Sequence, residues 1–170
     1  MQNVLTYAQT VLTSTPERWL NLAKLLPADL LRLPAAPGEW SALECLQHLV
    51  DTERWVFPVR VQYFLNGQDF PAFDPDTQGS QLNGPADPAG LAAEFDLLRH
   101  NSLAVLAKIK PDDLQRSAGH QELGAVTLGE MLHEWAGHDL MHTVQAERAL
   151  MQPFIQGSGA WQVYFKDHIA

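Results

Sequence analysis

The 170-residue sequence predicts an all-α protein, a four-helix bundle in which a long crossover joins the second and third helices. Apolar residues recur every three or four positions in four long stretches, which is the period of an amphipathic helix. No segment shows a convincing strand pattern. The stretch 66–87 is rich in Gly, Pro, Asp and Asn, and it is too long for an ordinary connection in a compact bundle. A chain of this size is expected to form a single domain, residues 1–170.

The first helix is predicted in two parts, Val4–Thr13 and Glu17–Leu26. Thr15 has the side chain of a helix N-cap, and Pro16 would occupy the first helical position, where its missing N–H is not needed. A short turn is expected at Ala28–Leu31, within a loop marked by prolines.

The second helix begins with a capping box, in which Ser41 and Glu44 satisfy each other's free backbone donors. Its apolar period continues to Asn66-Gly67, a typical stop signal. Pro58 lies inside this run and is expected to kink the helix or loosen one turn.

The crossover 66–87 is predicted to be either a simple connection or a functional flap whose Phe70, Phe73 and Asp74–Asp76 form the rim of a pocket. The third helix is expected from Asp87-Pro88 to Lys110.

A polar loop is expected at Pro111–Val126. The capping box of Thr127 and Glu130 then predicts a fourth helix that ends near Met151, before Pro153. The tail 153–170 is expected to fold over the bundle as a short helix.

Composition excludes several classes of protein. The chain is 46% hydrophobic and 18% charged, as globular proteins are, and no apolar run approaches the length of a membrane span. The net charge is −9 and the basic residues are scattered, so direct nucleic-acid binding is not expected. The single cysteine, Cys45, is interpreted as a buried apolar residue. The absence of a disulfide framework and of a secretory signal favours the cytoplasm.

Three histidines carry the main functional signal. His138 and His142 are four residues apart and therefore stack on one helix face, where two imidazoles can share a divalent cation. His48 lies on the inward stripe of the second helix, with Cys45 and Trp55, and facing helices of a bundle commonly assemble metal sites. The competing interpretation is that these are core histidines, each hydrogen-bonded to a neutral group.

Other polar residues are ranked lower. His133-Glu134 is not a zinc-protease motif, because the next histidine comes one position late. Glu134 and Asp51 each lie one turn from a candidate ligand, so either could orient an imidazole or accept a proton. Glu44 is expected to be used by its capping box. The remaining histidines are expected at the surface: His100, His120, His133 and His168. The aromatic residues Trp40, Tyr63 and Trp135 are expected to have packing roles.

The chain resembles the DinB/YfiT-like superfamily of metalloenzymes over residues 15–152, in the order and spacing of three motifs. These are Trp40-Ser41 followed by Glu44, Leu46, His48-Leu49, Asp51 and Glu53; Gly124-x-x-Thr127-Leu128; and His138-x-x-x-His142-x-x-Gln145.

The resemblance implies a four-helix bundle in which His48, His138 and His142 hold one divalent metal ion, zinc, nickel or iron. It also implies a small-molecule substrate, in some relatives a low-molecular-weight thiol, and frequent homodimers. No cofactor-binding residues for such a thiol are identified in this sequence.

Three hypotheses for function follow. The first is a metalloenzyme, because three neutral imidazoles leave a divalent ion with an open position suited to hydrolysis or thiol S-transfer. The second is a bundle with a structural or sensory metal. The third is a metal-free ligand-binding or dimeric bundle.

Overall fold

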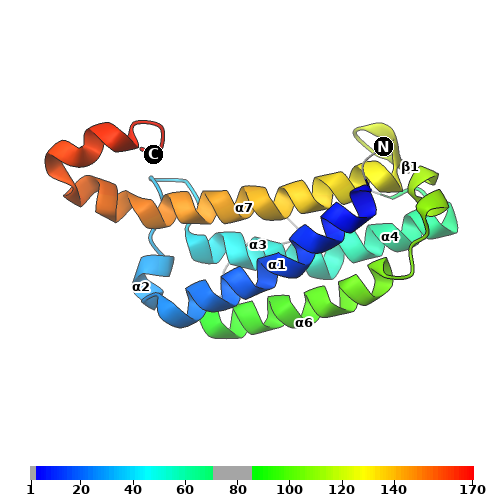
Figure 1. The fold of residues 1–170 in the computed structure, drawn as a ribbon, viewed down its shortest axis with the longest axis horizontal. Coiled ribbons are helices and arrows are strands. Elements are labelled where there is room, and N and C mark those ends of the chain that lie inside the picture. The colour runs from blue at the N-terminus through cyan, green and yellow to red at the C-terminus, as the bar shows by residue number, and fades with distance from the viewer. Residues whose placement is uncertain (1–2, 71–85) are drawn as a thin grey trace.

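The computed structural model describes residues 3–70 and 86–170. It confirms an all-α four-helix bundle, whose long members are α1 (Val4–Leu25), α3 with α4 (Ala42–Trp55 and Phe57–Asn66), α6 (Pro88–Leu106) and α7 (Leu128–Gly157). Figure 1 shows these helices side by side, with α2 (Ala28–Leu31) at one end of the bundle. The predicted residues Phe73 and Asp74–Asp76 lie outside the described residues.

Helix α1 is continuous, so the prediction of two parts with Thr15 as an N-cap is wrong. Pro16 has no N–H and leaves the carbonyl of Leu12, four residues earlier, without its helical partner. That carbonyl instead accepts a hydrogen bond of 2.9 Å from Nη1 of Arg99 on α6. The Thr15 hydroxyl donates to the Val11 carbonyl at 2.9 Å. A tertiary contact therefore replaces the helical hydrogen bond that the proline removes.

The second rod of the bundle is broken, as Pro58 predicts. Helix α3 ends at Trp55, Val56 connects the two segments, and Pro58 lies in the first turn of α4. The capping box at the start of α3 is confirmed, with Glu44 accepting from the Ser41 N–H at 2.7 Å and from its hydroxyl at 2.6 Å. Trp55 was expected to face inward, but its exposed fraction is 61%.

The segment after α6 corrects two predictions. Helix α6 ends at Leu106 rather than Lys110, and a 3₁₀ helix, η1 (Pro111–Gln115), follows. The expected polar loop is an antiparallel hairpin of β1 (Ser117–His120) and β2 (Gly124–Thr127). Four-residue strands containing Gly and polar residues carry too little alternation for their sequence to predict them.

The hairpin is tied to the segment that leaves α4. The N–H of Phe70 donates to the Gly119 carbonyl at 3.1 Å, and the N–H of Gly119 donates to Asp69 Oδ1 at 2.6 Å. A Cβ at position 119 would lie 2.9 Å from that carboxyl group, so the close approach requires glycine. These bonds hold Phe70 and His120 against each other at the end of the bundle.

Helix α7 begins at the predicted capping box but passes through Pro153 and ends at Gly157, six residues beyond the predicted stop at Met151. Buried Ile155 keeps the extra turn packed against the protein. The tail forms the 3₁₀ helix η2 (Gly159–Phe165) and folds back on α7, where Gln152 Nε2 donates to the His168 carbonyl at 2.8 Å.

Two apolar clusters form the core, one toward the hairpin end and one toward α2. On α7 the first cluster reaches Trp135 and the second begins at Ala146. The polar residues His138, Asp139 and His142 lie between them. Asp139 and Thr143, on the same helix, are buried as well. A polar layer therefore crosses the middle of the bundle.

That layer contains an ion network that joins all four long helices. Arg99 on α6 contacts Glu53 on α3 at 2.8 Å, Asp139 on α7 at 2.7 Å and the Leu12 carbonyl on α1 at 2.9 Å. Burial alone would lower the pKa of Arg99, but the Asp139 and Glu53 carboxylates outweigh it and hold that pKa above its usual range. No described helix is both long enough and apolar enough to span a bilayer.

Candidate metal centre

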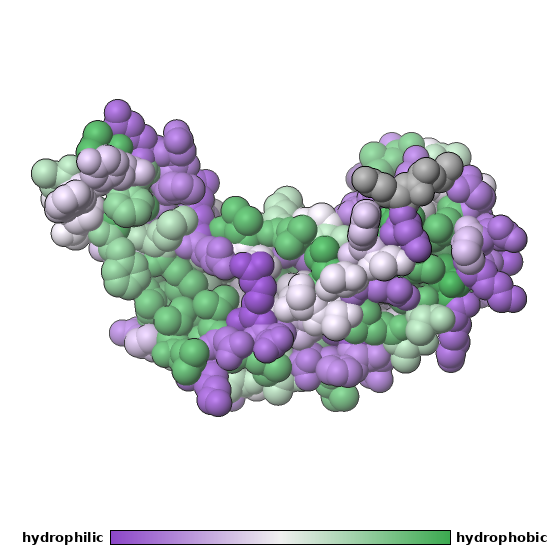
Figure 2. Space-filling model, in the orientation of Figure 1, coloured by the Kyte–Doolittle hydropathy of each residue, from purple (hydrophilic) through white to green (hydrophobic). Residues whose placement is uncertain are grey.

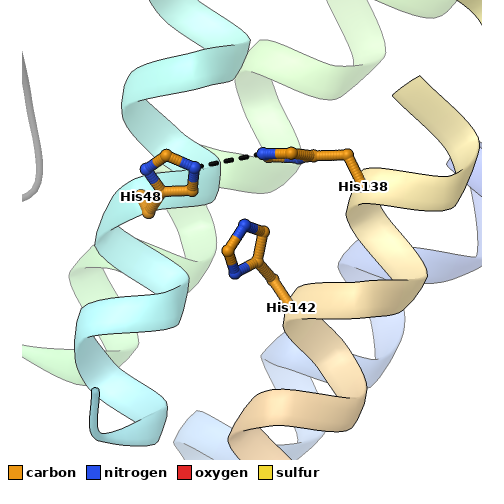
Figure 3. Close-up of side chains that lie close together, drawn as sticks. All are labelled: His48, His138 and His142. Carbon is orange, nitrogen blue, oxygen red and sulfur yellow. Dashed lines mark hydrogen bonds between the residues drawn. The ribbon is translucent and has the colours of Figure 1, made fainter. Parts of the chain in front are cut away.

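His48, His138 and His142 converge in the polar layer, as the sequence predicts (Figure 3). His48 comes from α3 and the other two from α7, where one helical turn separates them. The Nε2 atoms of His48 and His138 are 3.0 Å apart. One potential ligand nitrogen from each of the three rings lies within 4.8 Å of the others. Nitrogen atoms this close can bind a single ion, so the residues fit a divalent metal.

The surroundings keep these imidazoles neutral. Burial and the nearby His142 lower the pKa of His48 to about 4. Burial, with the positive charges of neighbouring histidines and Arg99, lowers the pKa of His138 to about 3, and burial also lowers the pKa of His142. A metal-ligating histidine must be unprotonated, so the three rings are in the required form at neutral pH.

Gln145 orients one of the rings. Its side-chain oxygen lies 2.9 Å from Nδ1 of His142, and an amide oxygen can only accept, so Nδ1 carries the proton and donates. The lone pair of His142 is therefore on Nε2. Fixing the tautomer in this way is the usual function of a residue that supports a metal ligand. Nδ1 of His138 is buried and has no hydrogen-bond partner among the described residues.

Aromatic rings wall the cluster. Trp40 is stacked on His142, with centroids 5.6 Å apart and planes at 18°, and it also contacts His48 at 5.0 Å. Phe57 packs edge-on against His138 at 5.1 Å and stacks on Trp135 at 5.0 Å. The packing role expected for Trp40 and Trp135 therefore includes holding the imidazoles.

A cavity of about 410 Å³ opens beside the cluster, lined by His48 and His138. Its other walls come from α3, α4, α7 and the hairpin: Thr52, Val56, Phe57, Arg60, Phe70, His120, Glu122, Leu123, Val126, Glu130, Met131 and Glu134. Half of these twelve side chains are apolar, and charged and polar groups make up the other half. This composition is typical of a small-molecule site.

Arg60 and Glu134 are oppositely charged residues of the cavity wall that influence each other's pKa. Partial burial raises the pKa of Glu134, while the Arg60 charge opposes that shift. Burial lowers the pKa of Arg60, and Glu134 opposes that change in turn. The guanidinium lies over the Phe70 ring, 5.0 Å from its centroid.

The two predicted catalytic residues differ in position. Glu134 lines the cavity one turn before His138. Asp51 is buried one turn after His48, and its Oδ1 accepts from the Gln47 amide at 3.1 Å. Among the described residues, the cavity lining includes Glu134 and does not include Asp51.

The other histidines are placed as predicted with one exception. His100, His133 and His168 are exposed. His120 is half-buried, lines the cavity and meets Phe70 edge-on at 5.6 Å, so the expectation of a surface position is wrong. Its Nδ1 accepts from the N–H groups of Glu122 and Leu123 at 3.2 and 3.3 Å. Its polar sequence context reflects the hairpin turn rather than bulk solvent.

Sequence reasoning did not identify Arg60, His120 or Phe57 as site residues. Arg60 follows Phe57 by three positions, which places both on one face of α4, but the direction of that face depends on the break at Val56. The motif His138-x-x-x-His142-x-x-Gln145 contains the residue that orients the His142 ring, and this spacing was the one signal for it in the sequence.

The bundle topology and the three-histidine cluster together define a class of helical proteins that can hold a metal between facing helices. The chain belongs to the DinB superfamily, whose family model matches residues 12–146. The fold is similar to that of YfiT from Bacillus subtilis, with a TM-score of 0.77 and 21% identity over 91% of this chain and 89% of YfiT. YfiT is described as a probable metal-dependent hydrolase with an unusual four-helix bundle topology. No curated protein sequence matches this chain.

Proposed function

We propose that this protein is a metal-dependent enzyme that activates a nucleophile, either water or a low-molecular-weight thiol, against a small substrate in the cavity. The single observation that carries the proposal is that two members of the histidine cluster also line that cavity. An ion held there would be accessible to a substrate, as in a catalytic site rather than a closed structural one. The similarity to YfiT favours hydrolysis, and thiol S-transfer is the second candidate because it needs the same kind of site.

His48, His138 and His142 would hold the ion. No fourth histidine, cysteine or carboxylate joins this cluster among the described residues, which supports a coordination position open to substrate. When bound, a divalent ion supplies Lewis-acid chemistry that lowers the pKa of water or of a thiol. Zinc suits a soft thiolate, whereas nickel or iron suits a six-coordinate site with several oxygen ligands.

Glu134 is the proposed proton acceptor, because it lines the cavity one turn before His138 and burial raises its pKa. Asp51 is proposed to support α3 near His48 rather than to transfer protons, since it is buried against Gln47.

We also propose a homodimer. Exposed large hydrophobic side chains, including Phe154, Trp161 and Tyr164, belong to the end of α7 and to η2. Figure 2 shows an apolar patch beside the tail at this end of the bundle. Light scattering would measure the mass of the protein in solution.

The test of the proposed function begins with metal content. The purified protein is expected to carry about one divalent ion per chain by elemental analysis, and the His138→Ala/His142→Ala variant is expected to carry none. The matched control, His100→Ala/His168→Ala, removes two exposed histidines and should keep the metal. Equal metal content in both variants would refute the ligand assignment.

Activity is then assayed with ester and amide substrates, with and without glutathione-like thiols. Glu134→Gln is expected to reduce turnover by roughly 10²- to 10⁴-fold at unchanged metal content, the usual contribution of a general base. Glu147→Gln, on the same helix but in an exposed pair with Arg18 outside the cavity, is the matched control and should retain turnover. Product analysis distinguishes hydrolysis from transfer to the thiol.

A further inference from the structure

We infer that the cavity binds a small molecule with an apolar body and a single carboxylate, and that the Arg60 guanidinium recognises this carboxylate. The inference adds a substrate class to the proposed function. It depends on that function only for the reaction at the end of the substrate near the histidines, and not for binding of the carboxylate by Arg60. It rests on the surroundings of Arg60, on the lining of the cavity and on the position of Arg60 relative to the histidine cluster.

The Arg60 side chain differs from the other arginines that lie near carboxylates. Arg18, Arg54, Arg99 and Arg116 form ion pairs. Arg60 is half-buried and lines the cavity, and among the described residues its guanidinium has no hydrogen bond and no ion pair. The Phe70 ring and the charge of Glu134 compensate only in part for the water that this guanidinium loses, because neither forms a hydrogen bond with it. A ligand anion would restore the interactions that this side chain has lost.

The orientation of the guanidinium suits a carboxylate. Its carbon lies 5.0 Å from the centroid of Phe70, over the ring. This contact does not engage the N–H donors of the guanidinium in hydrogen bonds, and a planar guanidinium can bind the two oxygens of a carboxylate together. Phe70 is itself buried and fixed by backbone hydrogen bonds to β1, so the platform is held by the fold.

The cavity between Arg60 and the histidines is suited to a hydrocarbon body. Six of the side chains that line it are apolar: Val56, Phe57, Phe70, Leu123, Val126 and Met131. Phe57 contacts the ring of His138, and Arg60 lies one turn further along α4, about 4.5 Å in axial rise. A molecule with its carboxylate at Arg60 therefore extends along the apolar wall toward the histidine cluster.

The remaining charges favour a monoanion over a phosphate. Glu122 and Glu134 line the same cavity as Arg60, and Glu130 is already engaged at the N-terminus of α7. A dianionic phosphate beside these carboxylates would meet stronger repulsion than a carboxylate would. One guanidinium is sufficient to balance a single negative charge.

The experiment uses 4-phenylbutyrate as the probe, with its uncharged amide and phenyl phosphate as comparisons, and measures binding by calorimetry. It is performed on metal-free and metal-loaded full-length protein, because a carboxylate can also bind a metal directly. In metal-free protein, Arg60→Met is expected to weaken binding of 4-phenylbutyrate by about 10- to 100-fold and to leave binding of the amide unchanged, since charge-assisted hydrogen bonds contribute about 1.5–3 kcal/mol. Arg60→Lys should recover part of the loss.

The control is Arg54→Met, which removes an arginine that pairs with Glu94 outside the cavity and should not affect binding. Unchanged amide binding also shows that Arg60→Met is folded. The inference is overturned if the wild-type protein binds acid and amide equally, if Arg60→Met retains the acid, or if phenyl phosphate binds more tightly than the carboxylate. If the wild-type protein binds no metal but still binds the acid in a way that depends on Arg60, the proposed function is refuted and the inference about Arg60 stands.

Discussion

Two buried polar clusters lie next to each other in the middle of the bundle, and neighbouring residues of α7, His138 and Asp139, belong to different ones. In the Arg99 network, opposite charges pair within 2.8 Å and a carbonyl of α1 completes the set. In the histidine cluster, three neutral rings bring nitrogen lone pairs together, and two of the rings line a cavity.

The difference indicates two separate functions. Buried, paired charges constrain how the four helices meet. Unprotonated imidazole nitrogens beside a cavity are instead suited to binding a ligand. The comparison predicts that mutations in the Arg99 network change stability, while mutations in the histidine cluster change metal affinity.

The largest expected effect is that of Arg99→Met. This change leaves Glu53 and Asp139 as buried carboxylates without a counter-charge and leaves the Leu12 carbonyl without its donor. The free energy of unfolding, measured by urea denaturation of metal-free protein, is expected to fall by about 3–5 kcal/mol. Arg18→Met, which breaks an exposed pair with Glu147, is the control and should cost at most about 1 kcal/mol. Similar losses for both variants would contradict the structural function of the network.

A smaller effect is expected for Gln145→Leu, which removes the acceptor of the His142 Nδ1 proton. Metal affinity, measured by competition with a chromophoric chelator, is expected to fall by roughly 10- to 100-fold, because supporting hydrogen bonds fix ligand orientation. Gln162→Leu, in the exposed tail, is the matched control and should leave the metal affinity unchanged. If Gln145→Leu binds metal as tightly as the wild type, then this hydrogen bond does not position the ligand.

The smallest expected effect is the change with pH in the free energy of unfolding of the metal-free protein. His48 and His138 have folded-state pKa values of about 4 and about 3, below the unfolded value of about 6.5. The folded state therefore binds fewer protons, so its stability is complete above pH 6.5 and decreases as the pH falls toward these values. Each histidine contributes a slope of at most about 1.4 kcal/mol per pH unit.

This slope is measured by denaturation between pH 7 and pH 4, within the range where the protein remains folded. The His48→Ala variant should show a shallower slope than the wild type, and His100→Ala, at an exposed site, should not change it. A wild-type slope that is insensitive to His48 would show that this ring is not held neutral.

The bundle and the three-histidine cluster could be predicted from sequence because they depend on local rules. Helical spacing places His138 and His142 on one face, and the capping boxes at Ser41 and Thr127 fix where their helices begin. These signals lie within a few residues of the feature that they determine. The presence of an inward histidine on each of two helices was then sufficient to indicate a shared site.

The remainder depends on partners distant in sequence. The continuation of α1 through Pro16 requires Arg99, and the burial of Asp139 requires the same residue. Hydrophobic periodicity treats a charged residue as exposed and cannot reveal a counter-charge 40 residues earlier. The cavity wall follows from the break at Val56 and from the hairpin, neither of which is encoded in a helical repeat.

The hairpin has a consequence for how relatives of this protein can diverge. Glu122 and Leu123 lie in the turn between β1 and β2 and form part of the cavity wall, yet they belong to none of the helices that carry the histidines. Replacing or lengthening this turn can change which molecules enter while the ion-binding scaffold stays intact. Turn exchange between homologues is thus a practical route to redesigned selectivity.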